Sequence, residues 1–137
     1  MLTISKSFTF EASHVLPRHP GKCARLHGHS WKLTVSVTGP VNPETGFVLD
    51  YKELSDMINI QIISGLDHRH LGQGIAQLPG GLVYPPFEED FYPSSENLVV
   101  RIAGIFGPLL KNRFPPDISL SEVRLAETCT CEAIWRP

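Results

Sequence analysis

Apolar and polar residues alternate along two stretches near the start of the chain, at residues 2–12 and again at 31–38. Successive side chains of a β-strand point to opposite faces of a sheet, so this alternation predicts two half-buried strands. Pro17, Pro20 and Gly21 interrupt the pattern between them. We therefore expect two neighbouring strands, antiparallel to each other and joined by an irregular segment.

Helical spacing of apolar residues follows in two further stretches. Between Asp50 and Ser64 the apolar positions repeat every three or four residues, Asp50 can cap the start, and Gly65 suits the exit. A second helix is expected to begin near Ser94 or Ser95. The residue at which this helix ends is not fixed by the pattern, because Pro108 follows Gly107 and proline cannot donate a hydrogen bond within a helix.

The end of the chain returns to alternation and completes the predicted fold. Val123 and Leu125, followed by Cys129, Cys131, Ala133 and Trp135, predict two more strands, with a bulge near Ser121-Glu122 where the parity breaks. The order ββααββ predicts an α+β domain with two helices on one face of a four-stranded antiparallel sheet. Its other face must meet solvent or another subunit. Residues 72–93, rich in Gly and Pro, are expected to form one long loop.

Length and charge exclude several classes of protein. The 137 residues suit a single domain spanning 1–137, and 12 basic against 14 acidic residues give no field that attracts nucleic acid or anionic lipid. No apolar run reaches the ~18 residues of a membrane helix, and residues at the amino terminus lack the charged, apolar and small-residue order typical of a signal peptide. Three cysteines do not form the framework of a small secreted domain. A soluble cytoplasmic protein is the expectation.

Three histidines are placed to share one metal ion. His27 and His29, two apart at the start of the second strand, face the same side, and the parity of His14 brings it to the same sheet face. Three histidines leave one position of a tetrahedral zinc ion open, as in catalytic sites. An HxH pair alone is weak evidence for a metal site, because a lone histidine is usually a surface or hydrogen-bonded residue. His19 and His70 are read as incidental.

Other candidates are less specific when each is read alone. Cys23 lies in a loop beside Lys22 and Arg25, where a thiolate is favoured, and it could be a ligand, a base or a nucleophile. Asp67 could orient His68 for proton transfer, although the same pair could be an exposed loop dipeptide.

Glu127 follows the parity of the preceding strand and could point its carboxylate toward the covered face of the sheet. A solvated charge at the strand end is the alternative that spacing alone favours.

Several separated motifs, taken together, resemble the 6-pyruvoyl-tetrahydropterin synthase superfamily. They are, in order, FEASH at 10–14, CARLHGH at 23–29, GFVLDY at 46–51, LDH at 66–68, SSENL at 94–98 and Glu127-Thr128. The three-residue gap between Cys23 and His27 is similar to that of bacterial 6-carboxy-5,6,7,8-tetrahydropterin synthases of the queuosine pathway. Family variants that form a hydroxymethyl pterin carry a glutamate near their catalytic position, whereas this chain has Ala24, which argues against that activity. Ser94 and Ser95 are mild departures from the threonine that the family usually has in this segment.

The resemblance implies a T-fold (tunnelling fold), with sheets joined in a trimer and two trimers stacked as a homohexamer. It implies that His14, His27 and His29 bind Zn²⁺ and that Cys23 transfers protons. Asp67 and His68 would form a dyad contributed by a neighbouring subunit, Glu127 would anchor the pterin, and Glu96 would be a further pterin contact. Arg18, Lys22 and Arg25 are candidates for the triphosphate, with no motif to select among them.

The implied reaction converts 7,8-dihydroneopterin triphosphate to 6-carboxy-5,6,7,8-tetrahydropterin with release of acetaldehyde and triphosphate, without a redox cofactor. Three alternatives stay open. The first is a 6-pyruvoyl-tetrahydropterin synthase, which only eliminates triphosphate. The second is a non-catalytic pterin-binding or assembly module, and the third uses zinc-bound water to attack an ester or carbon dioxide.

Overall fold

A computed structural model describes residues 1–73 and 90–137 of the chain. Within them, five strands form one sheet in the order β3-β1-β2-β4-β5. The strands are β1 (Leu2–His14), β2 (His27–Gly39), β3 (Arg69–His70), β4 (Ser119–Ala126) and β5 (Glu132–Trp135). The helical elements are η1 (Lys22–Ala24), α1 (Tyr51–Ile58), the π-helical turn η2 (Asn59–Ile63), α2 (Ser64–Leu66) and α3 (Ser95–Arg113).

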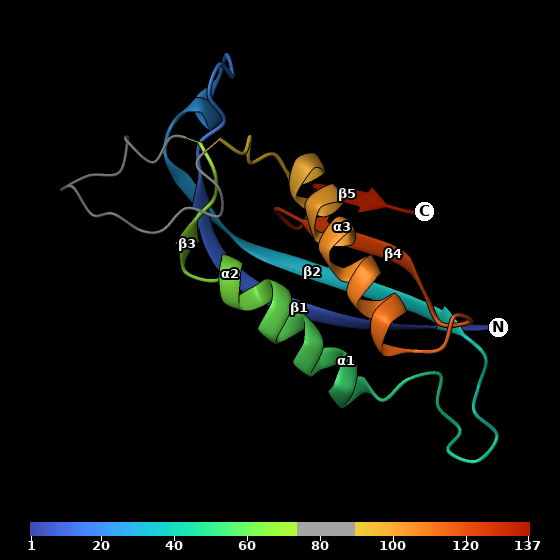
Figure 1. The fold of residues 1–137 in the computed structure, drawn as a ribbon. Coiled ribbons are helices and arrows are strands. Elements are labelled where there is room, and N and C mark those ends of the chain that lie inside the picture. Colours follow the sequence, from blue (N-terminus) through green and yellow to red (C-terminus); the bar gives the residue numbers. More distant parts are fainter. Residues whose placement is uncertain (74–89) are drawn as a thin grey trace.

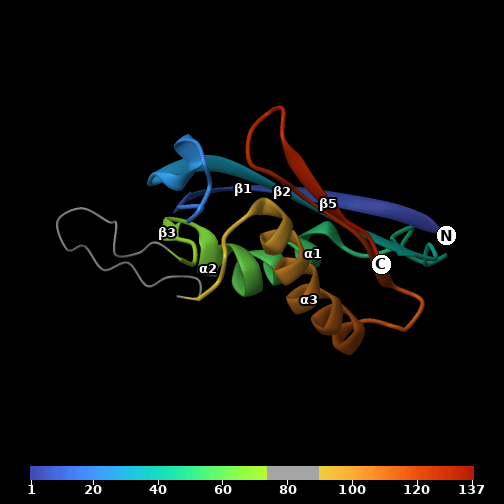
Figure 2. The ribbon, with the colours of Figure 1, turned by 90° about the horizontal axis from the view of Figure 1, so that it is seen from above.

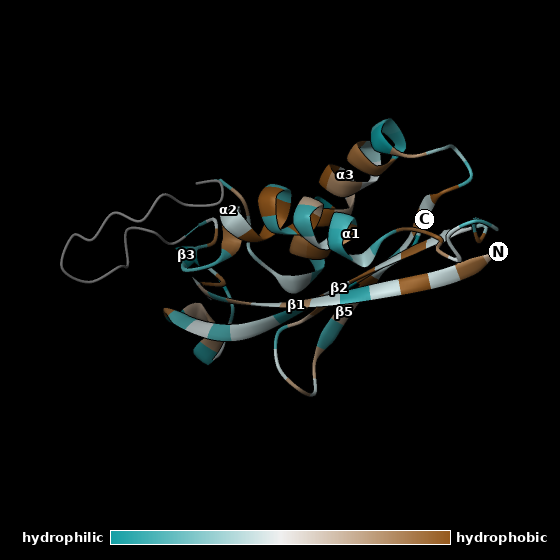
Figure 3. Cartoon of the chain, turned by 90° about the horizontal axis from the view of Figure 1, so that it is seen from below, coloured by the Kyte–Doolittle hydropathy of each residue, from teal (hydrophilic) through white to brown (hydrophobic). Residues whose placement is uncertain are grey.

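The helices α1, α2 and α3, with the turn η2, lie on one side of the sheet and leave the opposite face open in the single chain, while η1 lies in the loop beyond the ends of β1 and β2 (Figures 1 and 2). The alternation in β1 and β2 explains this layering, because one parity is buried and the other carries hydroxyls. Phe10 stacks on Trp31 beneath the helices, with ring centroids 6.0 Å apart. On the open face, Ser5 and Ser36 pair their hydroxyls across the strands at 2.8 Å. The buried residues of α1 and α3 are all apolar, and hydrophobic (brown) and hydrophilic (teal) positions alternate along the helices in Figure 3.

The first predicted helix is present but is not a uniform α-helix. Asp50 caps it as expected, accepting the Lys52 amide at 2.7 Å. The helical path then widens into the π turn η2 and continues through α2 to Leu66, so Gly65 lies inside the last turn rather than beyond it.

The second predicted helix begins where expected, with the Ser94 hydroxyl accepting the Asn97 amide at 3.2 Å. It continues through Pro108 to Arg113. Gly104 lies four residues before Pro108, and its Cα faces open space. The buried stripe of α3 against the sheet outweighs the missing amide of one proline.

The predicted four-stranded antiparallel sheet was wrong in one respect, because the sheet is mixed and has a fifth strand. β3 pairs with β1 in parallel through Ala12 opposite Arg69 and Ser13 opposite His70. Two residues carry no alternation, so this strand had no pattern to reveal it. The expected bulge in β4 is confirmed, since the pairing with β2 shifts between Ser36 and Val37.

Cys129 and Cys131 do not lie on a strand as predicted. They occupy the exposed turn between β4 and β5 and are free thiols, as is the half-buried Cys23. The predicted loop at 72–93 falls mostly outside the described residues. No helix in the described part of the chain combines the length and hydropathy needed to cross a membrane.

Candidate metal and acid–base site

His14, His27 and His29 come together at one end of the β1–β2 pair. In the ladder, His14 lies opposite His27 and Ala12 opposite His29, so both strands present the three rings on the helix-covered face. The Nε2 atom of His14 is 3.0 Å from that of His27 and 3.1 Å from that of His29. The convergence predicted from strand parity is therefore present.

Backbone carbonyls fix the protonation of two of these rings. The Nδ1 of His14 lies 2.8 Å from the Pro93 carbonyl oxygen, and that of His27 lies 2.6 Å from the Arg25 carbonyl oxygen. A carbonyl only accepts, so each Nδ1 carries the proton and each Nε2 of the neutral ring presents a lone pair. Two lone pairs facing each other at 3.0 Å repel unless a cation lies between them. This donor set fits a metal ion, with carbonyls orienting the ligands as in known sites.

Burial favours the neutral form of His14 and of His29. His14 is completely buried, and desolvation lowers its pKa to about 4, although the hydrogen bond to Pro93 opposes the shift. Burial also lowers the pKa of His29, against the raising effect of the Glu127 carboxylate. Trp31 packs its ring edge-on to both histidines, with centroids 5.1 and 5.3 Å away. Neutral imidazoles at physiological pH are the form that binds zinc.

Glu127 reaches the same point from the end of β4. Its Oε1 lies 3.3 Å from Nε2 of His14 and 3.5 Å from Nε2 of His29. The carboxylate thus borders the centre on which the histidines converge, and it is not the fully solvated strand-end charge that spacing favoured. Its backbone amide donates to the Cys131 carbonyl at 3.0 Å, which anchors it at the base of the β4–β5 turn.

Cys23 lies in the short helical turn η1, between the strands that carry the histidines. The turn closes through the Arg25 amide, which donates to the Lys22 carbonyl at 3.0 Å, and the Cys23 carbonyl accepts the Leu16 amide at 2.9 Å. The Arg25 carbonyl then holds His27. The backbone around Cys23 is therefore tied to His27 of the cluster within four residues.

Asp67 and His68 form the predicted pair at the other edge of the sheet. Asp67 Oδ2 lies 3.0 Å from His68 Nδ1, while Oδ1 accepts the Glu11 amide at 2.9 Å. The Glu11 amide, with a smaller effect from His68, lowers the pKa of the Asp67 carboxyl. His68 adopts a left-handed backbone with φ of 57° and donates its amide to the Glu11 carbonyl. Two contacts with β1 thus fix the pair, and the His68 side chain remains 79% exposed.

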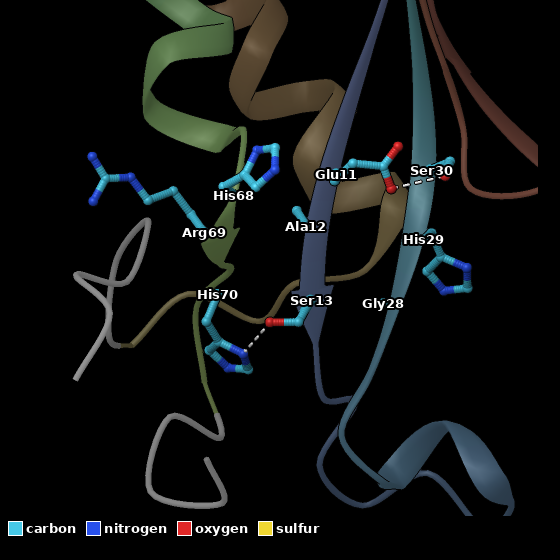
Figure 4. Close-up of a pocket in the computed structure, with 9 residues that line it drawn as sticks. All are labelled: Glu11, Ala12, Ser13, Gly28, His29, Ser30, His68, Arg69 and His70. Atoms are coloured by element: carbon cyan, nitrogen blue, oxygen red, sulfur yellow. Dashed lines mark hydrogen bonds between the residues drawn. The ribbon is translucent and has the colours of Figure 1, made fainter. Parts of the chain in front are cut away.

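A hollow of about 460 Å³ lies between this edge and the open face of β1 and β2. His29 and His68 both belong to its lining, whereas His14, His27 and Asp67 do not, and the three histidine rings converge on the opposite, helix-covered face. Figure 4 shows His70 pointing at Ser13, Glu11 turned toward Ser30 and Arg69 pointing away. The hydroxyl of Ser30 donates to Glu11 at 2.8 Å.

The remaining predicted residues have simpler surroundings. Glu96 is exposed in the first turn of α3, where its carboxylate accepts from the Ser95 hydroxyl at 3.2 Å, and no described contact joins it to the histidines. His19 is exposed and caps its own turn. His70 is buried, with Ser13 on one ring nitrogen and the Gln73 carbonyl on the other, so it secures β3.

Sequence reasoning missed the residues that orient the ligands. Pro93 and Arg25 act through main-chain carbonyls, which no side-chain pattern reveals. Tyr92 was missed too, and its hydroxyl donates to the Pro17 carbonyl at 2.9 Å, joining the segment before α3 to the loop after β1. The one sequence feature that could have indicated this contact is the aromatic Tyr92 itself, next to Pro93.

Comparison with known sequences places the chain among pterin enzymes. The family model for 6-pyruvoyl tetrahydropterin synthase matches residues 3–137. A protein of Synechocystis named 6-carboxy-5,6,7,8-tetrahydropterin synthase is 36% identical, covering 97% of this chain and 92% of the relative. One of the same name from Haemophilus influenzae is 32% identical, covering 96% of this chain and 98% of the relative.

Solved structures agree on the fold. The 6-pyruvoyl tetrahydropterin synthase of Caenorhabditis elegans superposes with a TM-score of 0.76 at 20% identity, covering 99% of this chain and 95% of that one. The Plasmodium falciparum enzyme superposes with a TM-score of 0.68 at 18% identity, covering 98% of each chain. These likenesses show the T-fold. With its nearly full-length match to the family model and its relatives above 30% identity, the chain is an enzyme of the 6-pyruvoyl tetrahydropterin synthase family.

Proposed function

We propose that the protein is a zinc-dependent 6-carboxy-5,6,7,8-tetrahydropterin synthase acting on 7,8-dihydroneopterin triphosphate. The observation that carries the proposal is the meeting of three Nε2 atoms, two of them oriented by carbonyls, beside the Glu127 carboxylate. The relatives named for this activity select it over other zinc chemistry. A role in queuosine biosynthesis and a cytoplasmic location stay predictions from the sequence.

His14, His27 and His29 would hold the zinc ion. When bound, zinc supplies a Lewis acid that makes substrate hydroxyls more acidic. The chain's own part is to keep these rings neutral and fixed, which burial and the carbonyls of Pro93 and Arg25 achieve. No redox cofactor is required, because the reaction oxidises one carbon of the substrate while it reduces another.

Glu127 would position the pterin. An aminopyrimidine edge presents neighbouring NH donors, and a carboxylate accepts two such donors in a pair. Because Glu127 also borders the histidine centre, a pterin bound to it would place its side chain next to the metal position. Glu96 is the weaker candidate for a second pterin contact, because it is exposed and bonded to Ser95.

Cys23 and the Asp67–His68 pair would move protons between the side-chain carbons. Asp67 holds Nδ1 of His68, which leaves the other ring nitrogen free to exchange protons with substrate. Cys23 would act as the base on the metal side. These assignments rest on the family motif and on where the backbone places both groups.

A homohexamer of two trimers would complete the site. The open sheet face with its hydroxyl pairs, the exposed His68 and the short edge strand β3 are features that a neighbouring subunit would cover. In this arrangement the pair from one subunit would meet Cys23 of the next.

The test is an assay of purified, zinc-loaded protein with 7,8-dihydroneopterin triphosphate. We expect acetaldehyde and triphosphate to appear in equal amounts with the carboxylated pterin. Accumulation of the pyruvoyl pterin without acetaldehyde would assign triphosphate elimination alone. Tight binding of the pterin with no turnover would point to a non-catalytic module.

A further inference from the structure

The loop that joins β1 to β2 contains basic residues and no acidic ones. Residues 15–26, called here the basic loop, carry Arg18, Lys22 and Arg25, and no acidic residue occurs between positions 12 and 43. All three cationic side chains are exposed. Across residues 1–73 and 90–137 none of the three forms an ion pair, whereas Arg113, Arg124 and Arg136 all do. Three cations in one loop without a counter-charge create a positive potential that attracts anions.

The basic loop is held in one shape rather than left free. Its backbone closes through the Leu16 amide on the Cys23 carbonyl and the His19 amide on the Leu16 carbonyl, at 2.9 and 3.1 Å. Arg18 lies with its guanidinium 5.6 Å from the centre of the Tyr92 ring, and Tyr92 bonds to the Pro17 carbonyl. A preformed loop binds an anion without first losing its own conformational freedom.

The basic loop and Glu127 reach the histidine cluster through different rings. Glu127 contacts His14 and His29, whereas the loop joins the cluster at His27, through the Arg25 carbonyl. A ligand that is anchored at Glu127 and passes the metal position therefore has the basic loop within reach of its far end. Arg69 also lines the hollow that His29 borders, but its side chain points away from it (Figure 4).

We propose that the basic loop binds the triphosphate tail of the substrate, with Arg18, Lys22 and Arg25 as its cationic contacts. This assignment rests on the proposed function, which supplies a substrate with a pterin at one end and a triphosphate at the other. Guanidinium and ammonium groups bind phosphate oxygens through charge-assisted hydrogen bonds, and Arg does so in pairs.

Binding to zinc-loaded protein in a Cys23→Ala background tests the assignment, with calorimetry of two probes, 7,8-dihydroneopterin and its triphosphate. The ratio of their Kd values measures what the triphosphate contributes. The test variant is Arg18→Gln/Lys22→Gln/Arg25→Gln. The matched control, Lys6→Gln/Lys52→Gln/Lys111→Gln, removes the same charge at the other end of the molecule.

We expect the triple loop variant to bind the triphosphate at least about tenfold more weakly, at about 1.4 kcal/mol per tenfold. The Kd of dihydroneopterin should change less than about twofold, and the matched control should retain the parent ratio. The assignment is overturned if the loop variant keeps that ratio or if both probes weaken equally. Failure of the proposed function shows differently, because the wild-type protein would then produce no carboxylated pterin whatever the ratio.

Discussion

His29 of the histidine cluster and His68 of the Asp67–His68 pair line the same hollow, yet the two groups have opposite surroundings. His14 is completely buried and its Nε2 has two histidine nitrogens within 3.1 Å. The His68 side chain is 79% exposed, and within residues 1–73 and 90–137 its one side-chain partner is the adjacent Asp67. One chain therefore brings the proposed metal ligands together in a buried cluster, while the proposed acid–base pair is left exposed to water.

The second ring nitrogen explains how each half is held. In the cluster, the Nδ1 atoms of His14 and His27 are held by backbone carbonyls, so the rings are fixed before any ligand arrives. At the pair, an exposed carboxylate holds Nδ1 of His68, and water competes for the same bond. The cluster is thus held within its own chain, whereas the exposed pair is consistent with the proposed neighbouring subunit.

The largest effect is expected from breaking the cluster. His14→Ala removes the central Nε2 of the cluster. We expect zinc affinity to fall by more than about 100-fold, which exceeds the loss typical of residues that only orient a metal ligand, and turnover to fall to background. Zinc content by elemental analysis and the acetaldehyde assay measure both. His19→Ala is the matched control, because His19 is exposed and caps only its own turn. Full zinc content in His14→Ala would show that the cluster is not the metal site.

Cys23→Ala should separate proton transfer from metal binding. Without its base the enzyme should lose about 10²- to 10⁴-fold in kcat, the usual contribution of one acid–base group, while zinc content stays at the wild-type level. Cys129→Ala, which removes an exposed thiol in the β4–β5 turn, should leave both unchanged. Loss of zinc in Cys23→Ala alone would make Cys23 a fourth ligand and reject its role as base.

Strand parity was enough to predict the histidine cluster and not enough to predict its support. The period of two along β1 and β2 places His14, His27 and His29 on the covered face whatever the rest of the chain does. The Pro93 carbonyl lies 79 positions further along the chain than His14 and enters the site only because α3 packs across the sheet. A contact of that kind depends on tertiary packing, which local patterns do not contain.

The edge of the sheet shows the same limit. Asp67 and His68 were found from the family motif, but the strand that follows them has two residues and no period to detect. The position of the pair depends on the Glu11 backbone, which receives the His68 amide and donates to Asp67. Main-chain partners leave no trace in side-chain chemistry. Cys129 and Cys131 were misplaced for a related reason, because their alternation continues through a turn.

Mixing subunits tests whether the pair acts on a neighbour. His68→Gln should lower kcat by about 10- to 100-fold while zinc content is kept, since it alters only one proton-transfer group. If each site takes Cys23 from one subunit and His68 from the next, co-assembly of Cys23→Ala and His68→Gln chains at equal ratio should regenerate about one intact site in four. Activity near a quarter of wild type supports the shared site. Activity no higher than that of the separate variants would place both groups in one chain.

The smallest expected effect is on the pH dependence of stability in chelator-treated protein. Burial lowers the pKa of His14 in the folded protein to about 4, against 6.5 for a free histidine. Between pH 4 and 6.5 this residue is therefore protonated in the unfolded chain and neutral in the folded protein. Stability from this group is therefore complete above pH 6.5 and is lost as the pH falls toward 4. The full difference of about 2.5 pKa units corresponds to about 3.5 kcal/mol, at about 1.4 kcal/mol per pKa unit.

Denaturant unfolding of wild type and His14→Gln at pH 7, 5.5 and 4.5 isolates this contribution, because other titrating groups cancel in the difference. We expect the wild-type protein to lose more stability than the variant across this range. His68 is exposed, so His68→Gln should follow the wild-type curve and serve as the control for a histidine outside the buried cluster. Equal pH dependence in wild type and His14→Gln would mean that burial does not hold the metal-free His14 neutral. The cluster would then resemble the exposed pair in needing something beyond its own chain.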